Sequence, residues 1–282
     1  MPKQLTAPAI AARKRSAGAD PLVMITAYDA PSARAVDAAG ADLILVGDSL
    51  AMVVLGYDDT LQVTVDDMAH HVAAVARAQP RPFVVGDLPW MSYHVDPAET
   101  VRNAATLIRA GAKSVKLEGG RKRLPMIEAI IDAEIPVMGH LGLTPQSVNA
   151  MGGFRVQGKT ADAALALVDD AKALDAAGCF AIVLEGVPDV VAQRVTDAVS
   201  VPTIGIGAGD GCDGQVLVYH DLLGIEDRMA PKFVRRYADL GGATVEALGR
   251  FVDDVRGGSF PSESETYHAS DDLNEALALY AG

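Results

Sequence analysis

Three carboxylic acids stand at the ends of three consecutive apolar runs in this chain. Asp48 follows LILVG, Asp87 follows FVVG, and Glu118 closes SVKLE. Carboxylates that converge on one spot suit a hard divalent cation with oxygen ligands, most naturally Mg²⁺ with some positions left to water. Each acid taken alone has an alternative interpretation, because acids at strand ends also cap the helices that follow. Three such acids together favour the metal site.

A lysine accompanies one of these acids. Lys116 lies two residues before Glu118 in the same apolar run. Side chains two apart on a strand point to the same face, and in a barrel that face is the interior. Because a buried lysine is costly unless it is paired, a Lys–Glu pair is one explanation. The other, which we favour, is a lysine that binds an anion beside a metal ligand.

A histidine and a further acid complete the strand-end groups. His140 lies in the segment GHLGLT, where a structural and a catalytic histidine are equally compatible with its position. Glu185 follows the apolar residues AIVL. A glutamate at such an end is a candidate general base, although a helix-capping acid would give the same pattern.

The apolar runs are the elements that would bring these groups together. Short runs of Val, Ile, Leu and Phe predict strands buried on both faces, which is typical of a parallel sheet under helices. Polar groups at the carboxyl ends of such strands, Asp29 at the first among them, predict an enzyme built on a (β/α)8 barrel. The predicted runs, the last of them less regular, are 24–29, 43–49, 83–90, 114–120, 136–144, 181–187, 202–209 and 215–221.

Between the runs, apolar residues recur at helical spacing. The spacing predicts helices over 65–79, 97–110 and 161–177, the last with Thr160 as its N-cap. Their predicted buried faces are Met68, Val72 and Val75, then Val101, Ala104 and Ile108, then Ala164, Leu167, Ala171 and Leu174. The lengths between runs leave room for one crossover helix each, as a barrel requires.

A doubly wound open sheet is the alternative fold, and it would need a glycine-rich phosphate loop after its first strand. The residues there read TAYDAPSA, without a glycine. The segment GDGCDG (209–214) matches G-x-G-x-x-G, but it follows the seventh run and lacks the acid-tipped strand that a ribose contact needs. We therefore predict a single (β/α)8 TIM-type barrel and interpret 209–214 as a tight loop that lets a ligand approach the backbone.

The length of 282 residues fits one barrel domain. Residues 6–18 are expected to form a short N-terminal helix against the barrel, so the catalytic domain with its N-terminal arm is assigned to residues 1–261. Residues 262–282 would be a C-terminal tail that is polar at first and ends in a short amphipathic helix.

The composition excludes several classes of partner. The net charge is −13, from 37 acidic and 24 basic residues, so nucleic acids and anionic membranes are poor partners. No apolar run approaches the roughly 20 residues of a membrane-spanning helix. Cys179 and Cys212 are the only cysteines, which argues for a reducing, cytoplasmic location. The motifs G-x-S-x-G, G-x-x-x-x-G-K-[ST] and C-x-x-C are missing.

The strand ends and their flanks resemble the ketopantoate hydroxymethyltransferase family. The similar stretches run in order from about residue 22 to 261, and HLGLTPQSVN-x-x-GG-x-x-VQG is the most specific. The others include ITAYD, LVGDS, GYD-x-T, DLPW, N-A-A-T, VKLEGG, GGFRVQGK, V-L-E-G-V-P, IGIGAG, CDGQVLV-x-x-D and KFVRRYAD. Enzymes of this family add a one-carbon unit to α-ketoisovalerate on the pathway to pantothenate and coenzyme A.

The resemblance implies a (β/α)8 barrel, a homo-oligomer that is usually a decamer of two pentameric rings, a Mg²⁺ site, and methylene-tetrahydrofolate as the one-carbon donor. By motif, it places the metal-binding acids at Asp48 and Asp87, with Glu118 in or beside the coordination shell. The acids found from the strand ends are therefore the acids that the family implies.

The same resemblance places the contacts to the keto acid at Ser49, Asp87 and Lys116, the proton acceptor at Glu185, and a supporting histidine at His140. In the implied reaction Glu185 removes the proton beside the ketone, and Lys116 offsets the developing negative charge. The enolate then attacks the methylene group that tetrahydrofolate carries.

Two segments depart from the family pattern. Residues 56–60 read GYDDT where many relatives have GH-x-S-T, and residues 260–265 read FPSESE where the family has FP-x-x-EHS. Two rival functions stay open. An enolate-handling barrel enzyme of the phosphoenolpyruvate mutase and isocitrate lyase type would be expected to show a catalytic cysteine motif, and neither cysteine lies in one. A non-catalytic, metabolite-binding protein of this fold would be expected to lose the carboxylates, which are all present.

Overall fold

The computed structural model describes residues 5–226 and 231–280. Within them, parallel strands close into a barrel in sequence order. The strands are β1 (Leu22–Thr26), β2 (Leu43–Val46), β3 (Phe83–Asp87), β4 (Ser114–Glu118), β5 (Val137–Gly142), β6 (Ala181–Glu185), β7 (Thr203–Ile206) and β8 (Gly214–Leu217). β1 pairs with β8, Leu22 opposite Gly214, which closes the ring. Each predicted run overlaps one strand, so the predicted barrel is confirmed.

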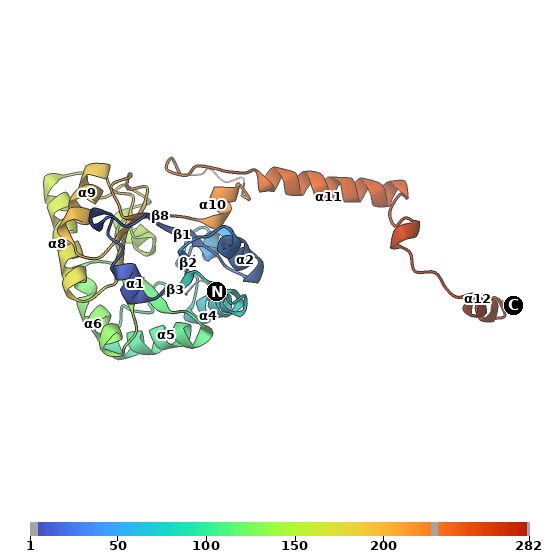
Figure 1. Ribbon diagram of the computed structural model, residues 1–282, viewed down its shortest axis with the longest axis horizontal. Coiled ribbons are helices and arrows are strands. Elements are labelled where there is room, and N and C mark those ends of the chain that lie inside the picture. Colours follow the sequence, from blue (N-terminus) through green and yellow to red (C-terminus); the bar gives the residue numbers. More distant parts are fainter. Residues whose placement is uncertain (1–4, 227–230, 281–282) are drawn as a thin grey trace.

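Helices surround the barrel (Figure 1). The crossover helices are α2 (Ala30–Ala38), α4 (Val65–Arg77), α5 (Pro97–Ala110), α6 (Leu124–Asp132), α8 (Ala161–Ala176) and α9 (Asp189–Ala198). Shorter elements are α1 (Ala7–Ala11), α3 (Leu50–Val53), α7 (Val148–Met151), α10 (Tyr219–Leu223), and the 3-10 turns η1 (Arg15–Ala17), η2 (Arg121–Arg123), η3 (Pro145–Ser147) and η4 (Glu263–Glu265). Beyond the last strand come α11 (Leu240–Gly257) and α12 (Asp271–Ala278).

Three of these helices were expected from apolar spacing, and α4, α5 and α8 confirm them. The Thr160 hydroxyl accepts a hydrogen bond from the Ala163 N–H, as an N-cap does. The face of α4 that carries Met68, Val72 and Val75 is buried as predicted.

The buried faces of α5 and α8 are displaced from the predicted ones. The buried residues are Thr100, Ala104 and Leu107 in α5, and Val168, Ala171 and Leu174 in α8. The predicted Val101, Ile108, Ala164 and Leu167 are only half-buried. Residues in two adjacent rows on a helix surface recur at the same spacing, so the spacing alone does not determine which row faces the sheet.

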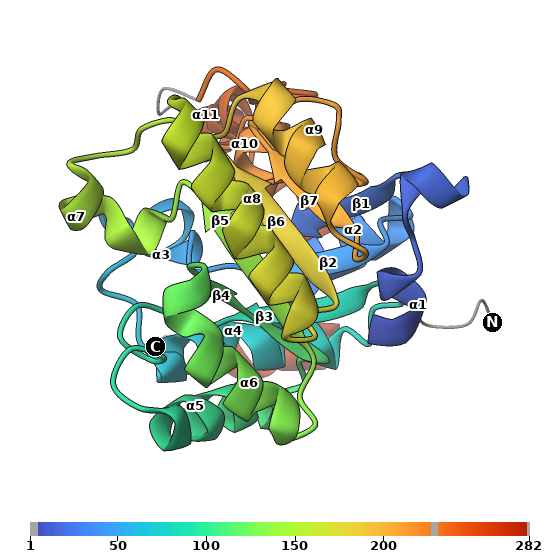
Figure 2. The same ribbon diagram turned by 90° about the vertical axis from the view of Figure 1, so that its left-hand side faces the viewer.

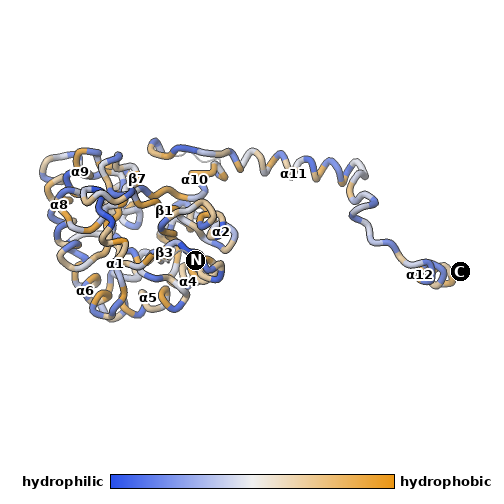
Figure 3. Tube along the Cα trace, viewed as in Figure 1, coloured by the Kyte–Doolittle hydropathy of each residue, from blue (hydrophilic) through white to orange (hydrophobic). Residues whose placement is uncertain are grey.

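The core has two layers because successive strand residues point to opposite faces. Outward-facing residues such as Val84, Leu117 and Ile182 pack in one cluster with the helices. Inward-facing residues such as Phe83 and Val183 form a second cluster inside the barrel. Figure 3 shows apolar residues along the strands and apolar residues alternating with polar ones along the helices.

The N-terminal helix α1 closes one end of the barrel. Ala7 and Ile10 are buried and belong to the cluster inside the barrel. Figure 2 shows α1 at one end, and α3 and α7 at the opposite end where the strands finish. The predicted packing of an N-terminal helix against the barrel is therefore observed. The first four residues of the predicted arm and the last two of the predicted tail lie outside the described residues.

Lys14 fastens the segment after α1 to the closed end. Its ammonium lies 2.8 Å from Asp213 Oδ2, and it donates hydrogen bonds to the carbonyl oxygens of Thr196 at 2.8 Å and Val201 at 3.3 Å. The Asp213 side chain is buried and also accepts the backbone N–H of Arg15. The arm is thus tied to the loops that precede β7 and β8.

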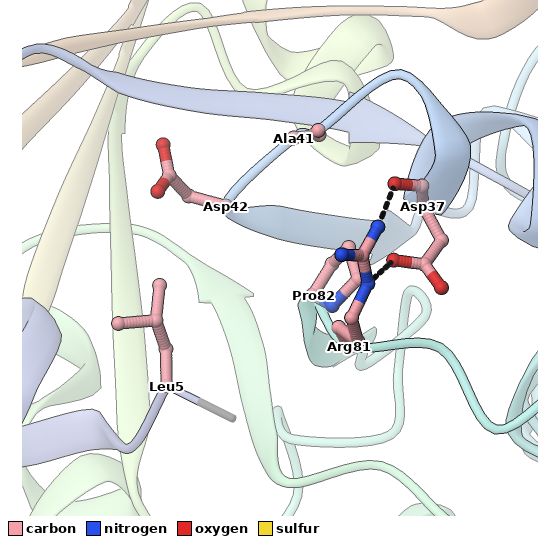
Figure 4. Close-up of a pocket in the computed structure, with 7 residues that line it drawn as sticks. Leu5, Asp37, Ala41, Asp42, Arg81 and Pro82 are labelled. Atoms are coloured by element: carbon pink, nitrogen blue, oxygen red, sulfur yellow. Dashed lines mark hydrogen bonds and ion pairs between the residues drawn. The ribbon is translucent and has the colours of Figure 1, made fainter. Parts of the chain in front are cut away.

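A small hollow of about 200 Å³ opens near the amino ends of β2 and β3 (Figure 4). Leu5, Asp42 and Pro82 line it, together with an ion pair between Arg81 and Asp37 at 2.6 Å. The Arg81 side chain is about half exposed, so this pair contributes little to stability. The hollow lies at the end of the barrel opposite to the predicted site.

Helix α11 does not pack on its own barrel. It projects from the barrel with α12 beyond it (Figure 1), and none of its residues is buried. The outer side of β1 and β8 is correspondingly bare, with Val23 46% exposed. α12 lies where a short tail helix was expected. None of the helices in the described parts of the chain combines the length and apolar character needed to cross a membrane.

The contrast between the two ion pairs leads to a stability prediction. Lys14→Met should lower the free energy of unfolding by about 3–5 kcal/mol, because Asp213 would stay buried without its counter-ion. Arg81→Met is the matched control and should change it by roughly 0–1 kcal/mol. Urea denaturation at one protein concentration measures both. Equal losses in the two variants would contradict the structural role given to Lys14.

Candidate active site

A cavity of about 940 Å³ occupies the barrel end at which the strands finish. The side chains predicted from the strand ends all line it: Asp48, Ser49, Asp87, Lys116, Glu118, His140 and Glu185. The parallel register explains their proximity, because Asp87 is the cross-strand partner of Lys116 and Glu118 that of His140. The barrel thus gathers into one chamber residues that are far apart in the sequence.

The partner of the buried lysine is an aspartate on the neighbouring strand. Lys116 Nζ lies 2.7 Å from Asp87 Oδ1, and both side chains are almost fully buried. Burial alone would lower the pKa of the Lys116 ammonium, but Asp87 and two further acids outweigh it and raise that pKa. The lysine is therefore a permanent cation. Glu118 does not form the close pair that one interpretation of the sequence expected.

His140 lies between this lysine and Glu185. Its Nδ1 is 3.3 Å from Lys116 Nζ, and its Nε2 is 3.2 Å from Glu185 Oε2. Burial and the nearby ammonium lower the pKa of His140, so its ring is neutral. An ammonium can only donate, so we assign the tautomer in which Nδ1 accepts and the Nε2–H faces Glu185. The histidine thus presents a proton to the Glu185 carboxylate.

The acids crowd one another. The backbone N–H of Asp48 donates to Asp87 Oδ2 at 3.3 Å. Burial raises the pKa of Asp48, raises that of Asp87 to about 7, and raises that of Glu118 well above its ordinary value. Among the described residues, Lys116 is the buried cation beside these three acids. Three buried carboxyl groups therefore share one buried lysine as their cation.

Such a donor set fits a hard cation, because added positive charge would relieve the repulsion and carboxylate oxygens are its preferred ligands. Within residues 5–226 and 231–280, however, no three histidine, cysteine or acidic side chains stand close enough to hold a metal ion unaided. One oxygen of Glu118 already accepts the backbone N–H of Gln146 at 3.1 Å. A metal here would need further ligands from water or a bound substrate.

Neutral polar residues that sequence reasoning missed hold these charged groups. Gln146, from η3, donates its amide N–H to Asp48 Oδ2, and the Tyr93 hydroxyl contacts both Gln146 and the Glu118 backbone. Tyr28 lies with its hydroxyl 2.9 Å from Ser49 Oγ, and His71 Nδ1 lies 2.6 Å from the Tyr28 carbonyl oxygen. Gln146 stands within a motif quoted for the family resemblance, which is the one signal that pointed toward it.

Some strand-end groups play other parts. Asp29 is the N-cap of α2, where its carboxylate accepts the Ser32 N–H at 2.8 Å. Asp29 was predicted as one of the polar groups at the strand ends, but the helix-capping interpretation is the right one for this acid. Cys179 and Cys212 are free and buried. In the loop 209–214, Gly209 lines the cavity whereas Gly211 packs against Gln193.

A barrel whose open end holds buried carboxylates, a lysine and a neutral histidine around one cavity defines a (β/α)8-barrel enzyme. The family model described as ketopantoate hydroxymethyltransferase matches residues 4–263. The chain belongs to this family.

Individual relatives agree with this assignment. A 3-methyl-2-oxobutanoate hydroxymethyltransferase of Ignicoccus hospitalis is 57% identical over 89% of this chain and 95% of the relative. An enzyme of the same name from Nitratidesulfovibrio vulgaris (strain DP4) is 55% identical over 94% of this chain and 86% of the relative.

Solved structures share the fold at low identity. A 2,3-dimethylmalate lyase, described as a member of the PEP mutase/isocitrate lyase superfamily, has a TM-score of 0.59 at 18% identity over 99% of each chain. A phosphonopyruvate hydrolase in complex with oxalate and Mg²⁺ has a TM-score of 0.59 at 14% identity over 98% of each chain. These likenesses concern the barrel, whereas the much higher identities above concern the family.

Proposed function

We propose that this chain transfers a hydroxymethyl group from methylene-tetrahydrofolate to α-ketoisovalerate (3-methyl-2-oxobutanoate). The product would be ketopantoate (2-dehydropantoate), an intermediate of pantothenate and coenzyme A biosynthesis. The observation that carries the proposal is the identity of 55% and 57%, over most of the chain, to relatives that bear this enzyme's name. The acids, lysine and histidine around the cavity supply the groups that the reaction needs.

Asp48 and Asp87 would hold a Mg²⁺ ion, with Glu118 in or beside its coordination shell. The excess of buried carboxylates over the single buried lysine supports this, since a cation would offset it. The Mg²⁺ complex of the phosphonopyruvate hydrolase supports a divalent metal in a barrel of this kind. A bound Mg²⁺ would act as a Lewis acid that polarises the keto group of the substrate.

Lys116 and Ser49 would hold the keto acid. The Lys116 ammonium is buried and permanently charged, so it would attract the carboxylate of the substrate and offset charge that develops on the enolate oxygen. The Ser49 hydroxyl lines the same cavity and is held by the Tyr28 hydroxyl. Asp87 would fix the position of the lysine through their ion pair.

Glu185 would remove the proton from the carbon beside the ketone. Its side chain is 17% exposed toward the cavity, more than the other acids, and one of its oxygens lies 3.2 Å from His140 Nε2. His140 would thus orient the base. The enolate carbon would form the new bond to the methylene carbon of the donor. Water would supply the hydroxyl oxygen and both carbon–nitrogen bonds of the methylene group would break. The two nitrogens of the released tetrahydrofolate would take up the proton held by Glu185 and one proton of the water.

The outer part of the cavity would receive the folate donor. At about 940 Å³ the chamber lies near the upper end of the ~300–1,000 Å³ typical of ligand pockets and far exceeds the needs of a small keto acid. Phe154 and Phe233 line it with rings that are 51% and 39% exposed, which suits a flat aromatic ligand. Arg155 and Lys232 line it as well and would attract the donor's carboxylates.

The activity itself provides the first test. The purified protein should form tetrahydrofolate from α-ketoisovalerate and methylene-tetrahydrofolate, EDTA should abolish the reaction, and added Mg²⁺ should restore it. Asp48→Ala and Asp87→Ala should each remove the Mg²⁺-dependent activity. Undiminished turnover in EDTA, or full activity of the Asp87 variant at limiting Mg²⁺, would contradict the metal assignment.

The role of Glu185 has a test that needs no folate. With Mg²⁺, the protein should catalyse hydrogen–deuterium exchange at the carbon beside the ketone of α-ketoisovalerate, followed by NMR. Glu185→Gln keeps the shape but cannot accept the proton, so exchange should fall by about 10²–10⁴-fold. Glu128→Gln on the exposed side of α6 is the control and should exchange like the unaltered protein. Exchange at the full rate in the Glu185 variant would move the role of base to His140.

The protein would act as a homo-oligomer, and the family resemblance implies a decamer. Val245, Leu248, Val252 and Val255 form an exposed apolar stripe along α11, while no helix of the described residues covers the outer side of β1 and β8. One copy therefore carries both an unpartnered helix face and a bare barrel face. A second copy that supplies its α11 to this barrel face would bury both.

Assembly is tested by substitution on α11. Leu248, which is 60% exposed, lies on the apolar stripe, so Leu248→Glu should shift the protein to smaller species in light scattering. Arg250→Glu on the polar side of the same helix adds the same side chain and should leave the assembly unchanged. A stable monomer of the unaltered protein at micromolar concentration would overturn the proposed oligomer.

A further inference from the structure

Gln146 is buried beneath the cavity and touches two of the three acids. Its side-chain Nε2 donates to Asp48 Oδ2 at 2.9 Å and to the Leu88 carbonyl oxygen at 2.9 Å. Its backbone N–H donates to Glu118 Oε2 at 3.1 Å. Only 4% of the residue is exposed, so water does not compete for these contacts. One neutral residue therefore links the acid that follows β2 to the acid at the end of β4.

The hydrogen bonds around this amide can run in one direction only. The Tyr93 hydroxyl accepts the Glu118 backbone N–H at 3.2 Å, so its own proton is donated to Gln146 Oε1. The Leu88 carbonyl can only accept, which requires the NH₂ group of the amide on that side. Tyr93 and Leu88 together thus determine which end of the Gln146 amide faces Asp48.

This orientation constrains the Asp48 carboxylate. Its Oδ2 is held by the amide, whereas no hydrogen bond among the described residues reaches its Oδ1. No ion pair with another described residue holds Asp48, unlike Asp87, so the Gln146 amide is the side-chain contact that sets the rotation of its carboxylate. The turn η3 sets the amide in place, with Pro145 at its first position and Gln146 at its second.

We propose that Gln146 is a positioning residue that turns Oδ1 of Asp48 toward the cavity for a divalent cation, and that Tyr93 holds the Gln146 amide in the required orientation. The inference rests on the metal site of the proposed function and adds to it residues that touch neither metal nor substrate. Residues that orient metal ligands through hydrogen bonds typically change metal affinity or activity by about 10–100-fold when they are replaced.

The test measures binding of Mn²⁺, as a probe for Mg²⁺, to the substrate-free protein by isothermal titration calorimetry. Gln146→Met has a similar shape but no amide, and we expect its dissociation constant for Mn²⁺ to rise about 10–100-fold. Tyr93→Phe keeps the ring and lets the amide rotate, so we expect a smaller rise. Gln193→Met, on the exposed side of α9, is the matched control and should bind as the unaltered protein does.

Steady-state kinetics supply a second readout that a merely structural role would not move. At limiting Mg²⁺ the activity of the two variants should fall and saturating Mg²⁺ should recover most of it, while the KM for the folate donor stays unchanged. If Gln146→Met does not fold, Tyr93→Phe carries the test. Unaltered Mn²⁺ affinity in a folded Gln146 or Tyr93 variant would overturn this inference and leave the proposed function intact. Failure of the unaltered protein to bind Mn²⁺ would overturn both.

Discussion

The ion pair between Lys116 and Asp87 is the interaction on which the open end of this barrel depends. Three acids lie almost fully buried within one chamber, and burial alone raises the pKa of each of them. Burial favours the neutral form of each acid, and a cation among them opposes this effect. The lysine supplies that cation, and the acids in turn keep it charged in the interior. The charge of the site and the stability of the fold therefore depend on the same ion pair.

The strand that carries the lysine, β4, separates the charged residues from the apolar core. Along β4, Val115 and Leu117 face the helices, whereas Lys116 and Glu118 face the chamber. A shift of one residue in the register would turn the charged pair into the apolar layer under the helices, so the hydrophobic pattern that specifies the fold also specifies the site. The remaining polar contacts come from loop residues such as Gln146 and Tyr93, which bring no additional charge.

The barrel and the charged part of the site could be predicted from sequence because both depend on local pattern. Apolar runs define strands, and an acid or lysine near a strand end falls at one rim in any closed parallel barrel. Asp29 has the same local pattern, yet its carboxylate caps α2. Asp48 is also followed at once by a helix, α3, but its carboxylate contacts Gln146 at the cavity, so the local pattern does not separate the two roles. Tyr93 and Gln146 are neutral and far apart in the chain, and their contact exists only after folding. Apolar spacing likewise does not predict that α11 projects from its own barrel, because an apolar stripe does not identify the surface against which the helix packs.

The position of helix α1 has a consequence for the order in which ligands enter and leave the cavity. Because it plugs one end of the barrel with Ala7 and Ile10, the chamber communicates with solvent by the opposite end. On the proposed function, the groups that hold the keto acid lie deep and those that hold the folate lie nearer the mouth. A reactant bound at the mouth blocks the passage of one bound below it. The keto acid must then bind before the donor, and tetrahydrofolate must dissociate before ketopantoate. A cavity with a single opening thus imposes ordered binding of the reactants and ordered release of the products.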